Sequence, residues 1–148
     1  MATVSPPWAY TLQLPRDPRA PGVARSTLRT VLAAHELAAF APTAELLASE
    51  LLTNAYLHTQ GPYALRIRCA EPGRLRVAVW DSDPVVPVAF GGSYPQPVDS
   101  GATAERGRGL HLVRACADAW GSYVLGDAGR ERGGKLLWAE CQGNLPRQ

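Results

Sequence analysis

Three polar residues that could do chemistry recur at helical spacing between positions 50 and 58 of the chain. The run Glu50-Leu51-Leu52-Thr53-Asn54-Ala55-Tyr56-Leu57-His58 places Glu50, Asn54 and His58 on one helix face. An amide oxygen is a hard ligand suited to Mg²⁺, and a carboxylate one turn away can orient or deprotonate an attacking hydroxyl. The spacing predicts a ligand and a base at the edge of a pocket. The alternative is an amphipathic helix whose solvated face carries these three residues.

A second candidate is the acid that ends an apolar run. Asp81 follows Val77-Ala78-Val79-Trp80 and begins the turn Asp81-Ser82-Asp83-Pro84. A buried carboxylate at a sheet edge accepts hydrogen bonds only, so it suits an exocyclic amine such as that of adenine. The alternative is a turn-initiating Asp that binds its own backbone.

A third candidate is the glycine-rich segment 101–113. Gly107-Arg108-Gly109 leads into a predicted helix, and backbone N–H groups at a helix start favour anions. Arg106 and Arg108 add guanidinium groups suited to phosphate oxygens. These features predict an anion-binding loop, and the alternative is a helix start with ordinary turn glycines.

Other nucleotide and metal motifs are incomplete. Leu112 stands where a dinucleotide fingerprint needs its third glycine, and Leu136 stands where a P-loop needs a hydroxyl. The P-loop-like segment, residues 129–136, is also followed by the strand-like run 137–140 instead of a helix. The three histidines show no metal-ligand spacing.

Composition bounds the remaining classes. The chain has 148 residues, a net charge of +2 and 46% hydrophobic residues, which indicates one globular domain and argues against a dedicated nucleic-acid binder. Cys69, Cys116 and Cys141 are far apart, so we expect reduced thiols. Neither a signal peptide nor a membrane span is apparent, so we expect a cytoplasmic protein.

The elements that must position these residues follow from periodicity and breakers. We expect a domain over 8–141 with flexible termini at 1–7 and 142–148. Thr43 is the predicted cap of the second helix. The predicted strands are 8–14, 63–69, 75–80, 122–125 and 135–141; the predicted helices are 22–40, 44–58 and 109–120; a long loop spans 82–108. This order predicts an α/β (α+β) two-layer sandwich, with a mixed, mostly antiparallel sheet covered on one face by helices.

The order of the three candidate segments resembles the GHKL ATPase superfamily of gyrase, histidine kinases and mismatch-repair proteins. The likeness is greatest to bacterial anti-sigma-factor serine/threonine kinases. Residues 50–58 look like the N-box, Asp81 like the adenine-binding acid of the first glycine box, and Gly107-Arg108-Gly109-Leu110-x-Leu112-Val113 like the second glycine box. Residues 134–140 look like the terminal strand. The resemblance implies a Bergerat-type ATP-binding fold.

The resemblance also implies roles. Glu50 would be the general base and Asn54 the Mg²⁺ ligand. Contacts to ATP would come from Asn54, His58, Asp81, Asp83, Arg106, Gly107, Arg108, Gly109, Leu110 and His111. Relatives of this branch phosphorylate a serine on a small antagonist protein and hold a sigma factor inactive. A homodimer through the first strand and helix is the corresponding expectation, without nucleic-acid or membrane contact.

Two departures from the family pattern leave alternatives open. Asp81-Ser82-Asp83-Pro84-Val85 replaces Asp-x-Gly-x-Gly, and Leu136 stands where many relatives have a threonine near adenine. A lost hydroxyl removes a hydrogen bond worth about 1 kcal/mol. One alternative is therefore an interaction module that binds no nucleotide. Another is a detached histidine-kinase catalytic domain, although no phospho-accepting helical hairpin is apparent. We expect the loop over 90–106 to be mobile without nucleotide because it has few apolar anchors.

Overall fold

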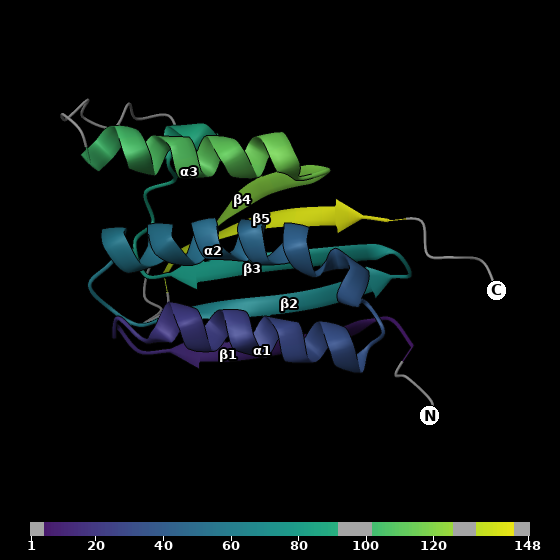
Figure 1. Ribbon diagram of the computed structural model, residues 1–148. Coiled ribbons are helices and arrows are strands. Elements are labelled where there is room, and N and C mark those ends of the chain that lie inside the picture. The colour runs from purple at the N-terminus through teal and green to yellow at the C-terminus, as the bar shows by residue number, and fades with distance from the viewer. Residues whose placement is uncertain (1–4, 92–101, 126–132, 144–148) are drawn as a thin grey trace.

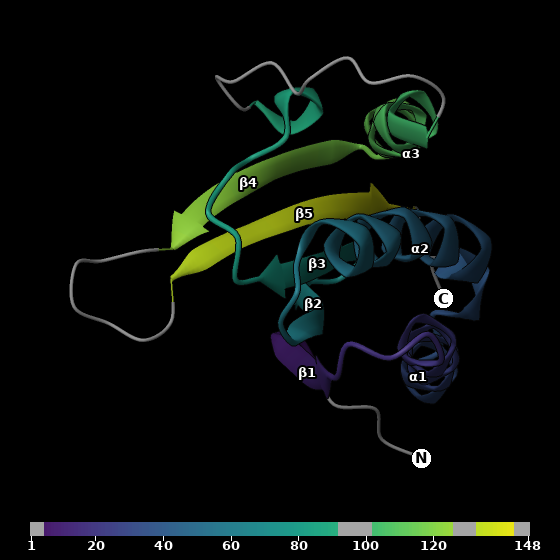
Figure 2. The same ribbon diagram turned by 90° about the vertical axis from the view of Figure 1, so that its left-hand side faces the viewer.

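The computed structural model describes residues 5–91, 102–125 and 133–143, without the side chains of 102–108. One antiparallel sheet has the strand order β1-β2-β3-β5-β4. The strands are β1 (Trp8–Leu14), β2 (Tyr63–Glu71), β3 (Arg74–Asp81), β4 (Ala119–Leu125) and β5 (Gly134–Gln142). The helices α1 (Ala20–Ala34), α2 (Ala41–His58) and α3 (Ala102–Cys116) cover one face of the sheet (Figure 1; Figure 2). The predicted two-layer sandwich is confirmed.

Alternation along the strands decides which face the helices cover. In β2, Leu65 and Ile67 are buried while Arg66 and Arg68 between them are exposed. Burial of apolar surface stabilises the folded state by about 25 cal/mol per Å². The sheet face that carries the apolar side chains therefore lies against the helices. α2 lies over the centre of this face and packs against β3, β5 and both other helices.

The first helix is shorter than its periodicity predicts. The prediction of one helix over 22–40 is wrong at its end, because α1 stops at Ala34 and a separate 3-10 turn, η1, spans Ala38–Phe40. Glu36 has a φ of 59°, and the Leu37 N–H donates to the Leu32 carbonyl at 2.7 Å. A left-handed residue cannot continue a right-handed helix, so the chain turns here.

The second helix begins earlier than predicted. α2 starts at Ala41, with Pro42 in its first turn and no side-chain cap. The prediction that Thr43 caps this helix is therefore wrong. Pro42 is accommodated there because its missing N–H costs nothing in the first turn, where that group has no partner within the helix.

The third helix corrects the prediction for the glycine-rich segment. α3 runs over Ala102–Cys116 instead of 109–120, so Gly107 and Gly109 lie inside the helix and not before its first turn. The expected anion site at a helix start that follows these glycines is wrong in that respect. Trp120 belongs to β4, where its ring lies 5.3 Å from that of Phe90.

The loop after β3 has an apolar anchor that was not expected. A 3-10 turn, η2, spans Val88–Phe90, and Phe90 is only 1% exposed. The Ser122 hydroxyl donates to the Phe90 carbonyl at 3.1 Å. Residues 92–101 of the predicted loop lie outside the described part of the chain.

Membrane crossing was not expected, and over residues 5–91, 102–125 and 133–143 no helix has the length and apolar content to span a bilayer.

Candidate functional site

The centre of the candidate site is α2, which carries both Glu50 and Asn54. Asn54 is 6% exposed, and its Oδ1 is buried without a hydrogen-bond donor among the described residues. A buried acceptor without a partner costs roughly 1–3 kcal/mol. Such an oxygen is suited to a ligand that brings its own positive charge or donor. The Asn54 oxygen therefore fits the predicted hard-cation ligand.

Glu50 lies at the contact between α2 and α3. A Cβ added to Gly109 would overlap the Glu50 Oε2 and would come within 3.4 Å of its Cδ. The carboxylate therefore lies directly against the α3 backbone, and this approach requires a residue without a side chain at position 109. The structure thus joins one residue of the predicted second glycine box to the predicted base.

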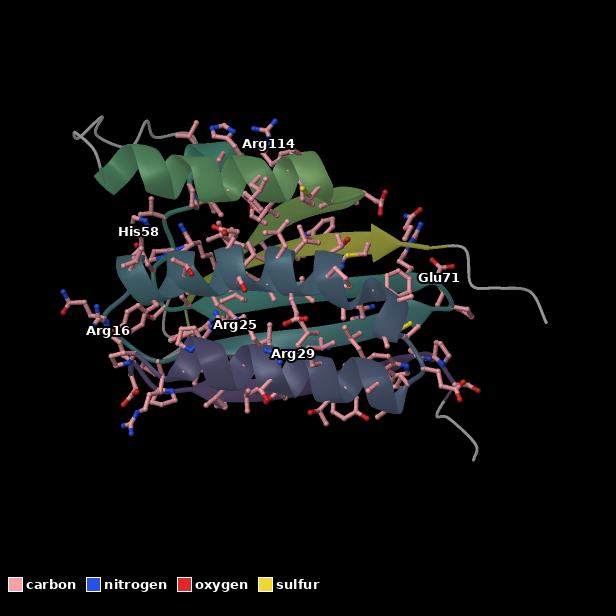
Figure 3. The ribbon with its side chains drawn as sticks, in the orientation of Figure 1. Arg16, Arg25, Arg29, His58, Glu71 and Arg114 are labelled. Atoms are coloured by element: carbon pink, nitrogen blue, oxygen red, sulfur yellow. The ribbon has the colours of Figure 1, made fainter. Side chains whose placement is uncertain are left out.

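The far end of α2 is tied to the end of β3. The hydroxyls of Thr59 and Ser82 share a hydrogen bond of 3.2 Å, and the Arg16 Nε donates to the Thr59 carbonyl at 3.0 Å. Arg16 and His58 lie at this same end of α2 (Figure 3). The residue that follows Asp81 is therefore held against the end of the helix that carries Glu50 and Asn54.

Asp81 forms a buried ion pair with the only lysine of the chain. The Lys135 Nζ donates to the Asp81 Oδ1 at 2.9 Å and to the Asp83 carbonyl at 2.9 Å. Both charged residues are 1% exposed. Burial raises the pKa of the Asp81 carboxyl above its ordinary 3.8, and the hydrogen bond from Lys135 opposes that shift. Since the described hydrogen bonds all reach Oδ1, Oδ2 is the oxygen left for a ligand amine.

β-Sheet register explains this pair and corrects the prediction for Leu136. Asp81 is opposite Lys135, and Leu136 is opposite Trp80. Successive side chains point to opposite faces of a sheet, so Leu136 lies on the face away from the helices and cannot stand at the Asp81 carboxylate. A Cβ added to Gly134, whose φ is +117°, would overlap the Asp81 carbonyl oxygen.

Lys135 is the site residue that sequence reasoning missed. Two features of the sequence could have identified it: Lys135 is the only lysine, and it directly follows Gly134. The register of β5 against β3 decides which residue after Gly134 meets Asp81, and that register was not available from the motif.

The other predicted contact residues have mixed placements. The Asp83 N–H donates to the Asp81 Oδ1 at 2.9 Å, and the Asp83 Oδ1 accepts the Val85 N–H at 3.0 Å, as in a turn. Leu110 is buried in the core, and His111 is exposed on α3. The side chains of residues 106–108 lie outside the description, so their contact with phosphate stays a prediction.

The donor set suits a cation that is shared with a ligand. The described residues contain no group of three or more His, Cys, Asp or Glu side chains that could enclose a metal. Mg²⁺ keeps several waters and is often held by one or two protein oxygens together with phosphate groups. The lone Asn54 oxygen fits that kind of site.

Comparison with known proteins relates the chain to a domain family and to a bacterial protein. A family model described as the histidine kinase-like ATPase domain matches residues 14–135. An uncharacterized protein of Streptomyces coelicolor is 40% identical over 81 residues, which are 53% of this chain and 71% of that protein. The family match includes Glu50, Asn54, Asp81, Gly109 and Lys135, so it spans every residue that the geometry brings into the site.

Proposed function

The chain belongs to the histidine kinase-like ATPase domain family, and from this premise we propose that it binds Mg-ATP and transfers the γ-phosphoryl group to a protein serine or threonine. The observation that carries the proposal is the arrangement of α2, where a buried amide oxygen without a partner lies one turn from a carboxylate in contact with α3.

Each residue has a role that its environment supports. The Asn54 Oδ1 would hold the cation, which neutralises phosphate charge when bound. The Asp81 Oδ2 would accept the exocyclic amine of the base. The Glu50 carboxylate would take the proton of the attacking serine or threonine hydroxyl. The hydroxyl oxygen bonds to the γ-phosphorus as the bond from that phosphorus to the leaving ADP breaks.

The partners follow from the resemblance to anti-sigma-factor kinases. We propose a small antagonist protein as the phosphoryl acceptor and a sigma factor as the protein held inactive. Phosphoryl transfer asks mainly for positioning and charge neutralisation, so a single domain of this size can supply it.

A titration calorimetry experiment tests the nucleotide site first. Mg-ATP added to the wild-type protein should give saturable binding, which Asn54→Ala should weaken by about tenfold or more because a phosphate-bound cation loses its protein ligand. Equal affinity of both proteins would contradict the assigned ligand.

A labelling experiment then tests the transfer. The protein is incubated with Mg-[γ-³²P]ATP and candidate antagonist proteins, and acceptor labelling should be lost in Glu50→Ala. Glu45→Ala is the matched control, since Glu45 lies on the same helix but pairs with Arg29 at 2.7 Å. Undiminished labelling by Glu50→Ala would remove the base from the proposal, and labelled phosphohistidine would favour a histidine-kinase domain.

One observation favours a second candidate, an interaction module that turns over no ATP. The Asp81 carboxylate is already paired through Oδ1 with a buried ammonium group, and this charge-assisted hydrogen bond draws negative charge away from the Oδ2 that an adenine amine would use. Absence of calorimetric binding at millimolar Mg-ATP would establish this candidate over the first.

A further inference from the structure

The sheet face turned away from the helices carries an arginine cluster that the nucleotide site does not use. A hollow of about 270 Å³ on this face is lined by Arg66, Arg68, Arg76, Ala78, Tyr123 and Leu136. None of the three α-helices lies on this side of the sheet (Figure 2). The hollow is therefore separate from the Asp81 and Lys135 side chains, which point to the helical layer.

The strand register brings positive charge together here. Arg68 is directly opposite Arg76 in the β2–β3 pairing, and Glu140 is opposite Arg76 on the other side. Like charges directly opposite each other destabilise a sheet. Glu140 lies 2.6 Å from the Arg76 Nη2 and so compensates one arginine. Arg66 and Arg68 are exposed and have no ion pair with any residue that the structure describes.

The aromatic residues beside the hollow are already engaged. The Arg76 guanidinium lies 3.8 Å from the centroid of the Trp138 ring. On the neighbouring strand, a Cβ added to Gly121 would come within 2.6 Å of the same ring. Trp138 is half-buried and also stacks with Tyr123 at a centroid distance of 6.4 Å, so little of its ring is left for a stacked nucleobase, and it holds Arg76 in place. The free interactions of the hollow are those of the Arg66 and Arg68 guanidinium groups, which lie beside the small Ala78.

We propose that this hollow, formed by Arg66, Arg68, Arg76, Ala78, Tyr123 and Leu136, is a docking site for an acidic segment of a partner protein. Arginine forks bind carboxylates with two parallel hydrogen bonds. Arg66 and Arg68, which pair with no acidic residue in the described part of the chain, lie beside Arg76, which is fixed by Trp138 and Glu140. Two neighbouring guanidinium groups select for closely spaced carboxylates. A nucleic acid is disfavoured because the cluster is small and its tryptophan already contacts Arg76 and Tyr123.

Fluorescence anisotropy with a labelled peptide of alternating glutamate and threonine tests this site. The wild-type protein should bind this peptide and should not bind the glutamine and threonine counterpart. Arg66→Glu with Arg68→Glu should weaken binding by about tenfold or more, because attraction becomes repulsion at the contact. Both side chains are exposed, and circular dichroism confirms that the variant folds; Arg66→Gln with Arg68→Gln replaces it if it does not.

The matched control reverses two arginines on the helical side of the molecule. Arg29 and Arg114 are exposed there (Figure 3), where they contact Glu45 and the Trp120 ring. Arg29→Glu with Arg114→Glu changes the net charge by the same amount, and circular dichroism confirms that this variant folds. Since the Debye length is about 8 Å at physiological salt, this variant should change peptide affinity by less than about twofold.

Several results would overturn the proposal. Equal losses in the two double variants would mean that only overall charge attracts the peptide, and absence of wild-type binding would remove the site. Equally tight binding of single-stranded RNA through Arg66 and Arg68 would assign the hollow to nucleic acid. A wild-type dimer in sedimentation equilibrium that Arg66→Glu with Arg68→Glu dissociates would assign it to a second copy of the chain.

Discussion

The Asn54 side chain should favour ligand binding without favouring stability. Substitution of this residue therefore separates a functional role from a structural one. Its Oδ1 is buried without a donor in the described structure. We expect Asn54→Ala to leave the free energy of unfolding within about 1 kcal/mol of wild type, or to raise it, because an unsatisfied acceptor is removed. Urea unfolding measures this change. A large loss of stability would mean that Asn54 has a structural role, and its weakened Mg-ATP binding would then not identify a ligand.

The buried Asp81–Lys135 pair predicts a strong effect of a single substitution. We expect Lys135→Met to lower the free energy of unfolding by about 3–5 kcal/mol at neutral pH, because a carboxylate is left buried without its partner. Addition of Asp81→Asn should restore most of this loss, since the unpaired charge is then gone. Urea denaturation of the two variants measures both changes, and additive losses would contradict the pair.

The same pair predicts a pH dependence with a definite sign. The pKa of Asp81 is raised in the folded state, and removal of Lys135 raises it further. The folded Lys135→Met variant then binds a proton more tightly than the unfolded chain. Its stability relative to wild type should therefore fall as pH rises above the ordinary carboxyl pKa of 3.8. Unfolding curves at several pH values test this, and no such trend should remain once Asp81→Asn is added.

At the scale of the element, two glycines on different helices should respond in opposite ways to alanine. A Cβ on Gly22 in α1 would meet only the Arg25 Nη2 at 3.8 Å, whereas one on Gly109 in α3 would overlap the Glu50 carboxylate. In a helix, alanine is favoured over glycine by roughly 1 kcal/mol. We expect Gly22→Ala to stabilise the protein without affecting activity.

Gly109→Ala should instead displace the flexible Glu50 carboxylate. We expect stability within about 1 kcal/mol of wild type, since the gain in helix propensity offsets the crowding, together with loss of phosphoryl transfer. Thermal unfolding and the labelling assay measure these effects separately. Full activity of Gly109→Ala would show that the position of Glu50 against α3 is not required.

Elements were predictable where a periodic apolar pattern is local. β1 has the predicted bounds, and β2 and β3 contain the predicted strands 63–69 and 75–80. The errors occur at proline and glycine, which are common in loops but can also lie within a helix. Pro42 lies in the first turn of α2, and Gly107 and Gly109 lie within α3 instead of before its first turn. Propensity alone cannot decide such cases, because packing of α3 against α2 overrides the preference of glycine for turns.

The candidate site was predictable in part for the same reason. Glu50 and Asn54 are on one helix, so their relation follows from helical spacing. The partner of Asp81 lies on β5, far along the chain, and depends on sheet register. A shift of one residue moves every side chain to the other face, which is why Leu136 was assigned to a position that Lys135 occupies.

For the whole molecule, the reactivity of the three cysteine thiols shows whether the core is packed. Cys69 and Cys141 are buried, and Cys116 is exposed on α3. Burial raises the pKa of Cys141 to about 11 and also raises that of Cys69. We expect iodoacetamide to modify only Cys116 in the native protein at pH 8, since the thiolate is the reactive form. Mass spectrometry after proteolysis identifies the sites, and rapid native modification of Cys141 would contradict the packing of β5.

The buried lysine of the candidate site can report on local opening of the structure through its chemical reactivity. Lys135 is the only primary amine on a side chain, and the surrounding protein hides it from solvent. Acylating reagents should therefore leave it untouched until the Asp81 end of the sheet opens. The rate of acylation at Lys135, separated by peptide mapping from acylation of the α-amino group, would follow that opening. Any molecule that seals the region would slow this reaction in proportion to its occupancy.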